Sequence, residues 1–442
     1  MATWTREAVG DFRDENVTTV RVAPQQARLR ARPETGRRRR IPTWLTGIGL
    51  VVLAAFVATV VKLAVQRWFM LDLRIYRWGG LLARHSGDLY GLHYSHFNLG
   101  FTYPPIAALI FAAMSAVSLA TLKFLITIGG VLSLIATSWL TWGALGYRRS
   151  VGRLGAALAA ASVILWFQPV VQTLYFGQVN LIMMMIIVAD LRLPDSFRLK
   201  GAGVGLAAGF KLTPLIFIAY LLLTRRFRAA SVAAETFALT IAVSFILLPG
   251  QSRSFWFGGL FLDPHRTGNN AYVGNQSLHG ALVRLLGSTA LAQDSWIGAS
   301  VIVGIAGLLL AAWAARHGRE MAGILLCALT GLLISPISWT HHWVWVAPAA
   351  IVVASLTVRR ETRLRLAAGR LPDWRQWARW AGLVAAAVPF FTLPQGLVAA
   401  AVVQGTGAHG TQLLTENLYV LIGLAVLGIA GFSVLRARRL VA

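Results

Sequence analysis

An acid, two arginines and several aromatic residues follow one another where the first long apolar run of the chain ends. Asp72 opens this stretch, and Arg74 and Arg77 come directly after it. A carboxylate at the mouth of a membrane span usually faces a wet cavity or the headgroup layer, because charge is costly in hydrocarbon. Arginine is a good phosphate ligand, and Tyr76 and Tyr103 suit a membrane interface. These residue types indicate a place where a phosphate-bearing lipid meets a polar co-substrate, although a helix cap or an ion pair with Arg74 would also explain Asp72.

Other polar side chains lie within apolar runs or at their ends. Lys211 has apolar neighbours on both sides, and inserting a lysine there costs about 3 kcal/mol unless it faces a cavity or a partner. The alternative is that its ammonium reaches back to the interface. Gln178 and Asn180 place two amides at the end of a run, where they can cap a helix or bind sugar hydroxyls.

Two later segments are also candidates for chemistry. The stretch 263–284, which contains Asn275, is polar and long. Such a loop is more often functional than filler, with a plain linker as the alternative. His341 and His342 open another apolar run. Because adjacent residues cannot lie on one helix face, a zinc pair is disfavoured, and contact with a phosphate or positioning of a hydroxyl is the favoured role.

Composition sets the class of protein. The chain has 442 residues, of which 57% are hydrophobic and 13% charged, with 16 tryptophans. These values predict a polytopic membrane protein. The net charge of +25 lies mostly in short segments between apolar runs, as orientation in an anionic membrane requires, so the expected partner is a lipid bilayer and not a nucleic acid. Cys327 is the single cysteine, which excludes an internal disulfide and a cysteine metal cluster.

The order of the segments predicts a topology. Residues 1–42 are polar and Arg-rich and are expected to form a disordered cytoplasmic tail before a membrane domain over 43–442. The basic cluster Arg37–Arg40 keeps the N-terminus inside, and a first span over 44–64 then carries Asp72 to the outer side. Residues 72–100 are too polar to span and suit short helices along the outer interface.

Hydropathy then predicts an all-α protein of about twelve transmembrane helices. After the first span, the apolar runs cover 104–120, 122–145, 154–169, 179–191, 202–223, 229–249, 296–316, 321–337, 343–358, 380–401 and 415–435. Most inner connections are basic, and the same count places 250–295 and 335–343 outside with Asp72. Strict alternation puts Gln168–Asn180 inside and the basic pair Arg148–Arg149 outside, both against expectation. Either a run between 104 and 223 is therefore re-entrant or the charge rule has local exceptions.

One motif is better explained by packing. Gly203–Ala208 matches the dinucleotide-binding pattern, but it follows no predicted strand and no acid lies about twenty residues on. Gly205 and Gly209 therefore indicate a small-residue contact between helices.

The candidate residues together resemble a known family. The resemblance runs from about Trp44 to His342 and rests on Asp72 with Tyr76, Phe101–Pro105, Gly177–Asn180, Lys211 with Pro214, Asn275–Ser277 and Ser335–His342. In this order they are similar to the polyprenyl-phosphate-mannose-dependent mannosyltransferases of glycosyltransferase family 87, and most of all to the α-1,2-mannosyltransferases that elongate phosphatidylinositol mannosides. The resemblance implies a GT-C fold with periplasmic interfacial helices, a catalytic loop over 72–103, a second periplasmic loop over 250–295, and Asp72 as the catalytic base. The donor would be polyprenyl phosphomannose and the acceptor a phosphatidylinositol mannoside glycolipid, in the plasma membrane with a periplasmic site.

The residues suit that chemistry. Inverting glycosyl transfer needs one carboxylate to take the proton of the acceptor hydroxyl and cations or hydrogen-bond donors at the phosphate. A phosphate leaves as an anion, so no general acid is needed, and a β-linked donor yields an α-linked product. With no acidic cluster on the outer side, we expect no metal and no cofactor. The candidates for binding the donor phosphate or substrate are Arg77, Tyr103, Lys211, Asn275, His341 and His342, with Gln178 and Asn180 for the sugar.

Three alternatives remain. A lipid or solute transporter would use Asp72 and Lys211 as pathway charges, but such proteins often show two related halves, and the Asp72 stretch has no counterpart in the second half. Within the same class, the alternatives are a mannosyltransferase that branches lipomannan or lipoarabinomannan, and an arabinosyltransferase that uses a polyprenyl-phosphate pentose.

Overall fold

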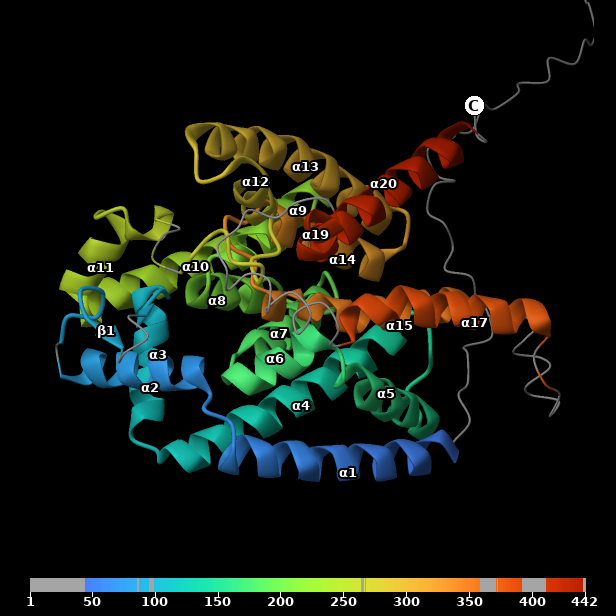
Figure 1. Ribbon diagram of the computed structural model, residues 1–442, viewed down its shortest axis with the longest axis horizontal. Helices are drawn as coiled ribbons and strands as arrows, with labels where there is room; N and C mark the ends of the chain where they lie inside the picture. The colour runs from blue at the N-terminus through green and yellow to red at the C-terminus, as the bar shows by residue number, and fades with distance from the viewer. Residues whose placement is uncertain are drawn as a thin grey trace, which may run out of the picture. The chain divides into compact units, whose positions relative to one another are not determined.

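The described part of the chain is built almost entirely from helices that pack on one another (Figure 1). The computed structural model describes residues 44–85, 87–94, 99–263, 266, 268–357, 371, 373–391 and 411–439. The predicted cytoplasmic tail over 1–42 lies outside these residues. The all-α expectation is confirmed in outline, with one small exception: β1 (His93–Tyr94) and β2 (Leu99–Gly100) pair antiparallel.

The first helices place the Asp72 stretch beside the chain that follows it. After α1 (Trp44–Gln66), helix α2 (Leu71–Arg84) packs along α3 (Pro105–Ser115). Helix α2 buries Leu73, Tyr76 and Gly80 on one face, the spacing of an amphipathic helix. A Cβ at Gly80 would lie 2.2 Å from the carbonyl oxygen of Phe111, so glycine is what allows the two helices to touch. Helix α3 begins at Pro105, as expected for a residue that lacks an N–H.

Helices α4 (Leu119–Ala144) and α5 (Val151–Ile164) pack with α1 and lead to a sharp bend. Both begin at a serine cap: Ser118 accepts from the N–H of Thr121, and Ser150 from that of Arg153. The bend follows, where α6 (Gln168–Phe176) and α7 (Asn180–Leu191) meet at 116°. Gly177 ends α6 with φ +71°, a left-handed conformation that favours glycine. Such a break is what a re-entrant or broken membrane segment requires, and it brings irregular backbone to a cavity.

The next apolar run is also interrupted. It forms α8 (Ala202–Phe210), the short 3₁₀ helix η3 (Thr213–Leu215) and α9 (Ile216–Leu223), and Lys211 lies in the break. Helix α8 packs closely on α10 (Phe227–Leu247). A Cβ at Gly205 would lie 2.3 Å from the carbonyl oxygen of Ala233, and one at Gly209 would lie 2.2 Å from Oγ1 of Thr240. The predicted small-residue contact is therefore confirmed.

The second half of the chain contains the remaining helices. The segment over 250–295 contains most of α11 (Pro249–Trp256), then η4 (Leu260–Leu262) and α12 (Leu278–Leu286). The long helix α13 (Ala290–Arg316) packs on α14 (Glu320–Ile334). The elements that follow are η6 (Thr340–Trp345), α15 (Val346–Thr357), α17 (Trp374–Ala387), η7 (Val388–Phe390), α19 (Thr411–Glu416) and α20 (Leu418–Arg439).

The number of spans differs from the sequence-based expectation. The described residues contain four helices long and apolar enough to cross a bilayer, within α4, α10, α13 and α20, or five if the bent pair α6–α7 counts as one span. Several other runs form apolar helices of 10–17 residues. Breaks such as that at Lys211 shorten them, which a hydropathy window does not detect. The structure thus supports a multi-pass membrane protein, while the count of about twelve stays a prediction.

Candidate active site

Asp72 meets the bend between α6 and α7. It lies in the first turn of α2, and its Oδ2 accepts a hydrogen bond of 2.7 Å from Nε2 of Gln178. The amide oxygen of Gln178 accepts from the hydroxyls of Tyr76 and Tyr103, the latter at 3.1 Å, and these two hydroxyls are 2.7 Å apart. Tyr76 is four residues after Asp72, so both side chains leave the same face of α2. This chain of hydrogen bonds determines how the carboxylate is oriented.

Asp72 does not pair with Arg74. Arg74 donates to the carbonyl oxygen of Phe69 at 2.8 Å, and its guanidinium lies 4.2 Å above the Phe69 ring, so it turns away from Asp72. Burial raises the pKa of Asp72 from 3.8 to about 6, while the hydrogen bond from Gln178 and the positive charge of Lys211 act in the opposite direction. A carboxyl group with this pKa is ionised at neutral pH and is a stronger base than an exposed aspartate.

A cation faces the same cavity. Nζ of Lys211 lies 2.9 Å from Nε2 of His342 and 3.3 Å from Oδ1 of Asn180. The ammonium also lies 5.7 Å from the centre of the Tyr103 ring, within the range of a cation–π contact. Lys211 therefore has a cavity and polar partners, and snorkelling to the interface is not needed to explain it.

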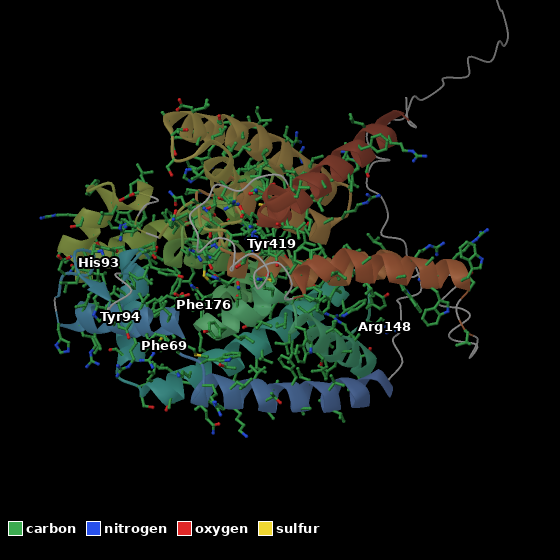
Figure 2. The ribbon with its side chains drawn as sticks, viewed as in Figure 1. Phe69, His93, Tyr94, Arg148, Phe176 and Tyr419 are labelled. Atoms are coloured by element: carbon green, nitrogen blue, oxygen red, sulfur yellow. The ribbon has the colours of Figure 1, made fainter. Side chains whose placement is uncertain are left out.

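The segment that carries the histidines is held by α6 and α7. The carbonyl oxygen of His341 accepts from Nδ2 of Asn180 at 2.8 Å and from the hydroxyl of Thr173 at 3.0 Å. The His341 ring lies 5.3 Å from that of Phe176, which is labelled in Figure 2. Nε2 of His341 is buried without a hydrogen-bond partner among the described residues. Asn180 thus anchors the backbone of this segment as well as contacting Lys211.

One cavity joins these groups. Its volume is about 1210 Å³, and its wall includes Asp72, Tyr103, Gln178, Lys211, His341 and His342. Asp72 and Gln178 are 106 residues apart, and Lys211 and His342 are 131 residues apart. Six of the residues singled out from the sequence therefore lie together, with a carboxylate and an ammonium facing one space.

Three of the nine candidates do not line the cavity: Asn180, which contacts Lys211 from behind the wall, Arg77 and Asn275. Arg77 is not among the described residues that line the cavity, and its Nε lies 3.4 Å from the carbonyl oxygen of Val117. Five positions along a helix turn the side chain by about 140°, which points Arg77 away from Asp72. Asn275 is fully buried. Its Oδ1 accepts from the N–H of Ser338 at 3.0 Å, so it joins the loop before α12 to the segment that carries the histidines and does not face the cavity.

Sequence reasoning missed part of the wall. Glu416 lines the cavity and lies in the C-terminal segment that matched no motif, whereas Tyr272 and Arg284 of the stretch 263–284 and Trp339 of Ser335–His342 line it within segments that the sequence singled out. Tyr419 of α20, labelled in Figure 2, donates from its hydroxyl to Oε1 of Gln168 at 2.7 Å. The one signal was an acid, Glu416, at the start of an otherwise apolar run.

The described residues do not form a metal site. Within the described residues, no three His, Cys, Asp or Glu side chains cluster as in a metal site. Independence of metal ions remains a prediction from the chemistry of the leaving group.

Comparison with known proteins identifies the family. The model described as glycosyltransferase family 87 matches residues 101–336. A Mycobacterium tuberculosis protein named as a polyprenol-phosphate-mannose-dependent alpha-(1-2)-phosphatidylinositol mannoside mannosyltransferase is 30% identical over 427 residues, 91% of this chain and 94% of the relative. Two proteins with the corresponding pentamannoside name are each 35% identical over 289 residues. The one from Mycobacterium tuberculosis matches 64% of this chain and 65% of its own length. The one from Mycolicibacterium smegmatis matches 63% and 68%. The match thus spans slightly less than two thirds of the length of the pentamannoside relative from Mycobacterium tuberculosis.

No solved structure matches the chain significantly. The family match covers more than half of the chain, and the mannoside mannosyltransferase aligns over nearly all of it. The resemblance expected from the motifs is confirmed, and the chain belongs to glycosyltransferase family 87.

Proposed function

We propose that this chain transfers mannose from a polyprenyl phosphomannose to a phosphatidylinositol mannoside and forms an α-1,2 linkage with inversion. The observation that carries the proposal is the pairing of Asp72 and Lys211 in one cavity, each held by neutral partners, Gln178 for the acid and Asn180 and His342 for the cation. The names of the relatives supply the sugar, the donor lipid and the acceptor.

The reaction forms one carbon–oxygen bond, breaks another and moves one proton. An acceptor hydroxyl gives its proton to Asp72 while its oxygen bonds to the anomeric carbon of the donor mannose. The bond between that carbon and the phosphate oxygen breaks, and both its electrons leave with the phosphate. Lys211 would stabilise the negative charge that gathers on the leaving group, with His341 and His342 beside it. The lipid phosphate leaves as an anion and needs no proton, so the reaction does not require a second carboxyl group as general acid.

The site is proposed to lie on the periplasmic side of the plasma membrane, with the N-terminus in the cytoplasm and a GT-C arrangement of helices. The basic connections 225–228 and 316–319 support this orientation, because lysine and arginine accumulate on the inner side. Leu262, in the segment proposed to lie outside, is 72% exposed, and Arg319, in a connection proposed to lie inside, is also exposed. In intact cells, Leu262→Cys should react with a thiol reagent that cannot cross the membrane, and Arg319→Cys should not. The native Cys327 is buried and gives little background. Labelling of Arg319→Cys with no labelling of Leu262→Cys would reverse the orientation.

The activity itself is tested with membranes that contain the full chain. Labelled polyprenyl phosphomannose is supplied with and without phosphatidylinositol mannoside, and the linkage of the product is determined. We expect mannose transfer that depends on the acceptor and continues in the presence of a chelator. Transfer from a polyprenyl-phosphate pentose in place of mannose, or to lipomannan in place of the glycolipid, would assign the site to one of the related enzymes.

A further inference from the structure

We propose that Tyr272 and Trp339 form a ledge that binds a sugar ring of the acceptor, next to the sugar that receives the mannose. We call these two side chains the aromatic ledge. The inference rests on the proposed function, since it assumes that the acceptor is a mannoside. It assigns a substrate contact to a part of the cavity wall that contains neither Asp72 nor Lys211.

The two rings are placed to receive the apolar face of a sugar. Tyr272 and Trp339 both line the cavity, and their ring centres are 6.0 Å apart at an angle of 58°. The side chain of Tyr272 is 47% exposed, and that of Trp339 is partly exposed. The C–H groups on one face of a pyranose pack well on aromatic rings, while its hydroxyls point outward to polar groups. An exposed aromatic pair inside a glycosyltransferase cavity suits such a ring.

Backbone contacts hold the ledge in place. Asn275 and Trp339 form an isolated antiparallel bridge, and the N–H of Thr340 donates to the carbonyl oxygen of Gly274 at 2.9 Å. A Cβ at Gly274 would lie 2.6 Å from the Tyr272 ring and 3.6 Å from that of Trp339, so a larger residue would displace Tyr272. The backbone of Asn275 therefore holds the backbone of Trp339 in place. A binding surface that is already ordered loses less entropy when its ligand arrives.

Polar groups that can bind hydroxyls border the ledge. Arg284 donates to the carbonyl oxygen of Tyr272 at 3.2 Å and to Oδ1 of Asn417 at 2.6 Å. Burial lowers the pKa of Arg284 to about 10, so it stays positive at neutral pH. Glu416 lines the same cavity. A guanidinium and a carboxylate supply a donor and an acceptor for sugar hydroxyls, and neither is required at the reacting carbon.

Size and position assign the ledge to the acceptor. A cavity of about 1210 Å³ exceeds the roughly 300–1,000 Å³ of ordinary small-molecule sites, so one mannose would leave much of it empty. The donor mannose must lie between Asp72 and Lys211, because the base and the phosphate cation act on the two sides of its anomeric carbon. Trp339 is three residues before His342, which contacts Lys211. The ledge is therefore near this position but on another part of the wall.

The inference is tested with acceptors of different lengths. Full-length protein in lipid nanodiscs is assayed with labelled donor and phosphatidylinositol mannosides that carry one, two or more mannoses. Trp339→Ala should raise the acceptor KM about tenfold for acceptors with at least two mannoses. The donor KM, and the KM for the single-mannose acceptor, should be unchanged. Trp339→Phe should recover most of the loss, because it keeps an aromatic face.

A matched control and a second variant complete the test. Trp374 on α17 is 73% exposed and does not line the cavity, so Trp374→Ala should leave every KM unchanged. Tyr272→Ala removes an exposed ring with little effect on folding and should behave like Trp339→Ala. If either ledge variant raises the donor KM, or affects all acceptors equally, the ledge does not select an acceptor sugar.

A binding measurement separates this inference from the proposed function. Binding of a short-chain phosphatidylinositol dimannoside to the protein in nanodiscs, without donor, should weaken about tenfold in Trp339→Ala and stay constant in Trp374→Ala. If the wild-type protein binds the dimannoside through Trp339 but transfers no mannose, the proposed function is wrong and the ledge remains. If it transfers mannose and Trp339→Ala binds as tightly as the wild type, the ledge is wrong and the function remains.

Discussion

Two groups of charged residues in this apolar chain are built in opposite ways. In the cavity, Asp72 is hydrogen-bonded to an amide, and Lys211 to an imidazole and an amide. In the connection before α10, Arg226 donates to both carboxylate oxygens of Glu320 at 2.6 and 2.5 Å, and it lies 3.3 Å from Asp195. The first group holds its charges apart and facing a space, whereas the second neutralises them directly.

The difference separates function from structural support. An ion pair with good geometry joins segments distant in the chain, as Arg226 and Glu320 do across 94 residues, and breaking it leaves an uncompensated charge. A charge held by neutral partners keeps its capacity to act on a substrate, at a cost in desolvation. The raised pKa of Asp72 reflects that cost. We therefore expect one substitution, carboxylate to amide, to have opposite effects in the two groups.

The largest effect is expected for Asp72→Asn. The amide keeps the size of the side chain but cannot accept the proton, so transfer should fall by about 10²–10⁴-fold. The thermal midpoint should not fall, because the substitution removes a desolvated charge. Asp72→Glu should also be strongly impaired, since it moves the carboxylate by about 1 Å. Single-turnover transfer at saturating donor measures both. Near-normal transfer by Asp72→Asn would show that Asp72 is not the catalytic base and has only a structural role in the first turn of α2.

The next largest effect is expected for Lys211→Ala. Loss of a cation opposite a phosphate costs about 2–5 kcal/mol, so the donor KM should rise strongly while the acceptor KM changes little. Lys62→Ala, at an exposed position of α1, is the matched control. A rise in acceptor KM alone would mean that the phosphate binds elsewhere in the cavity.

A moderate effect is expected from pH. As pH falls below about 6, Asp72 becomes protonated and the rate should drop about tenfold per pH unit. The hydrogen bond from Gln178 lowers the pKa of Asp72, so Gln178→Leu should raise that pKa and move the acid limb of the profile to higher pH. A profile of kcat/KM against pH for the two proteins measures this. An unchanged limb in Gln178→Leu would show that the limb belongs to another group.

The smallest effect is expected for Glu320→Gln, the counterpart of Asp72→Asn in the second group. The substitution keeps hydrogen bonds to Arg226 but leaves that cation partly unpaired, so stability should fall by about 1–2 kcal/mol. Transfer per folded molecule should be unchanged. Thermal unfolding in detergent and the rate per folded molecule test these two outcomes. If Glu320→Gln lost activity while keeping its full stability, the Arg226–Glu320 pair would also serve function, and the two groups of charges would not differ in role.

Properties that depend on local order could be predicted from the sequence. Apolar runs indicated where helices form, and Gly205 and Gly209 indicated a close contact between helices. The family was also accessible from the sequence, because short motifs in a fixed order identify it without coordinates.

Which polar residues meet could not be predicted, because it depends on how distant segments pack. Asp72 and Gln178 are 106 residues apart, and no local pattern links them. Arg77 lies close to Asp72 in sequence but turns away, because helix geometry separates positions five apart. Asn275 looked like a ligand because it is polar and lies in a loop, yet its burial makes it an anchor of that loop. Hydropathy records how apolar a segment is, whereas contacts between distant segments, which only packing creates, determine what a polar side chain in it can do.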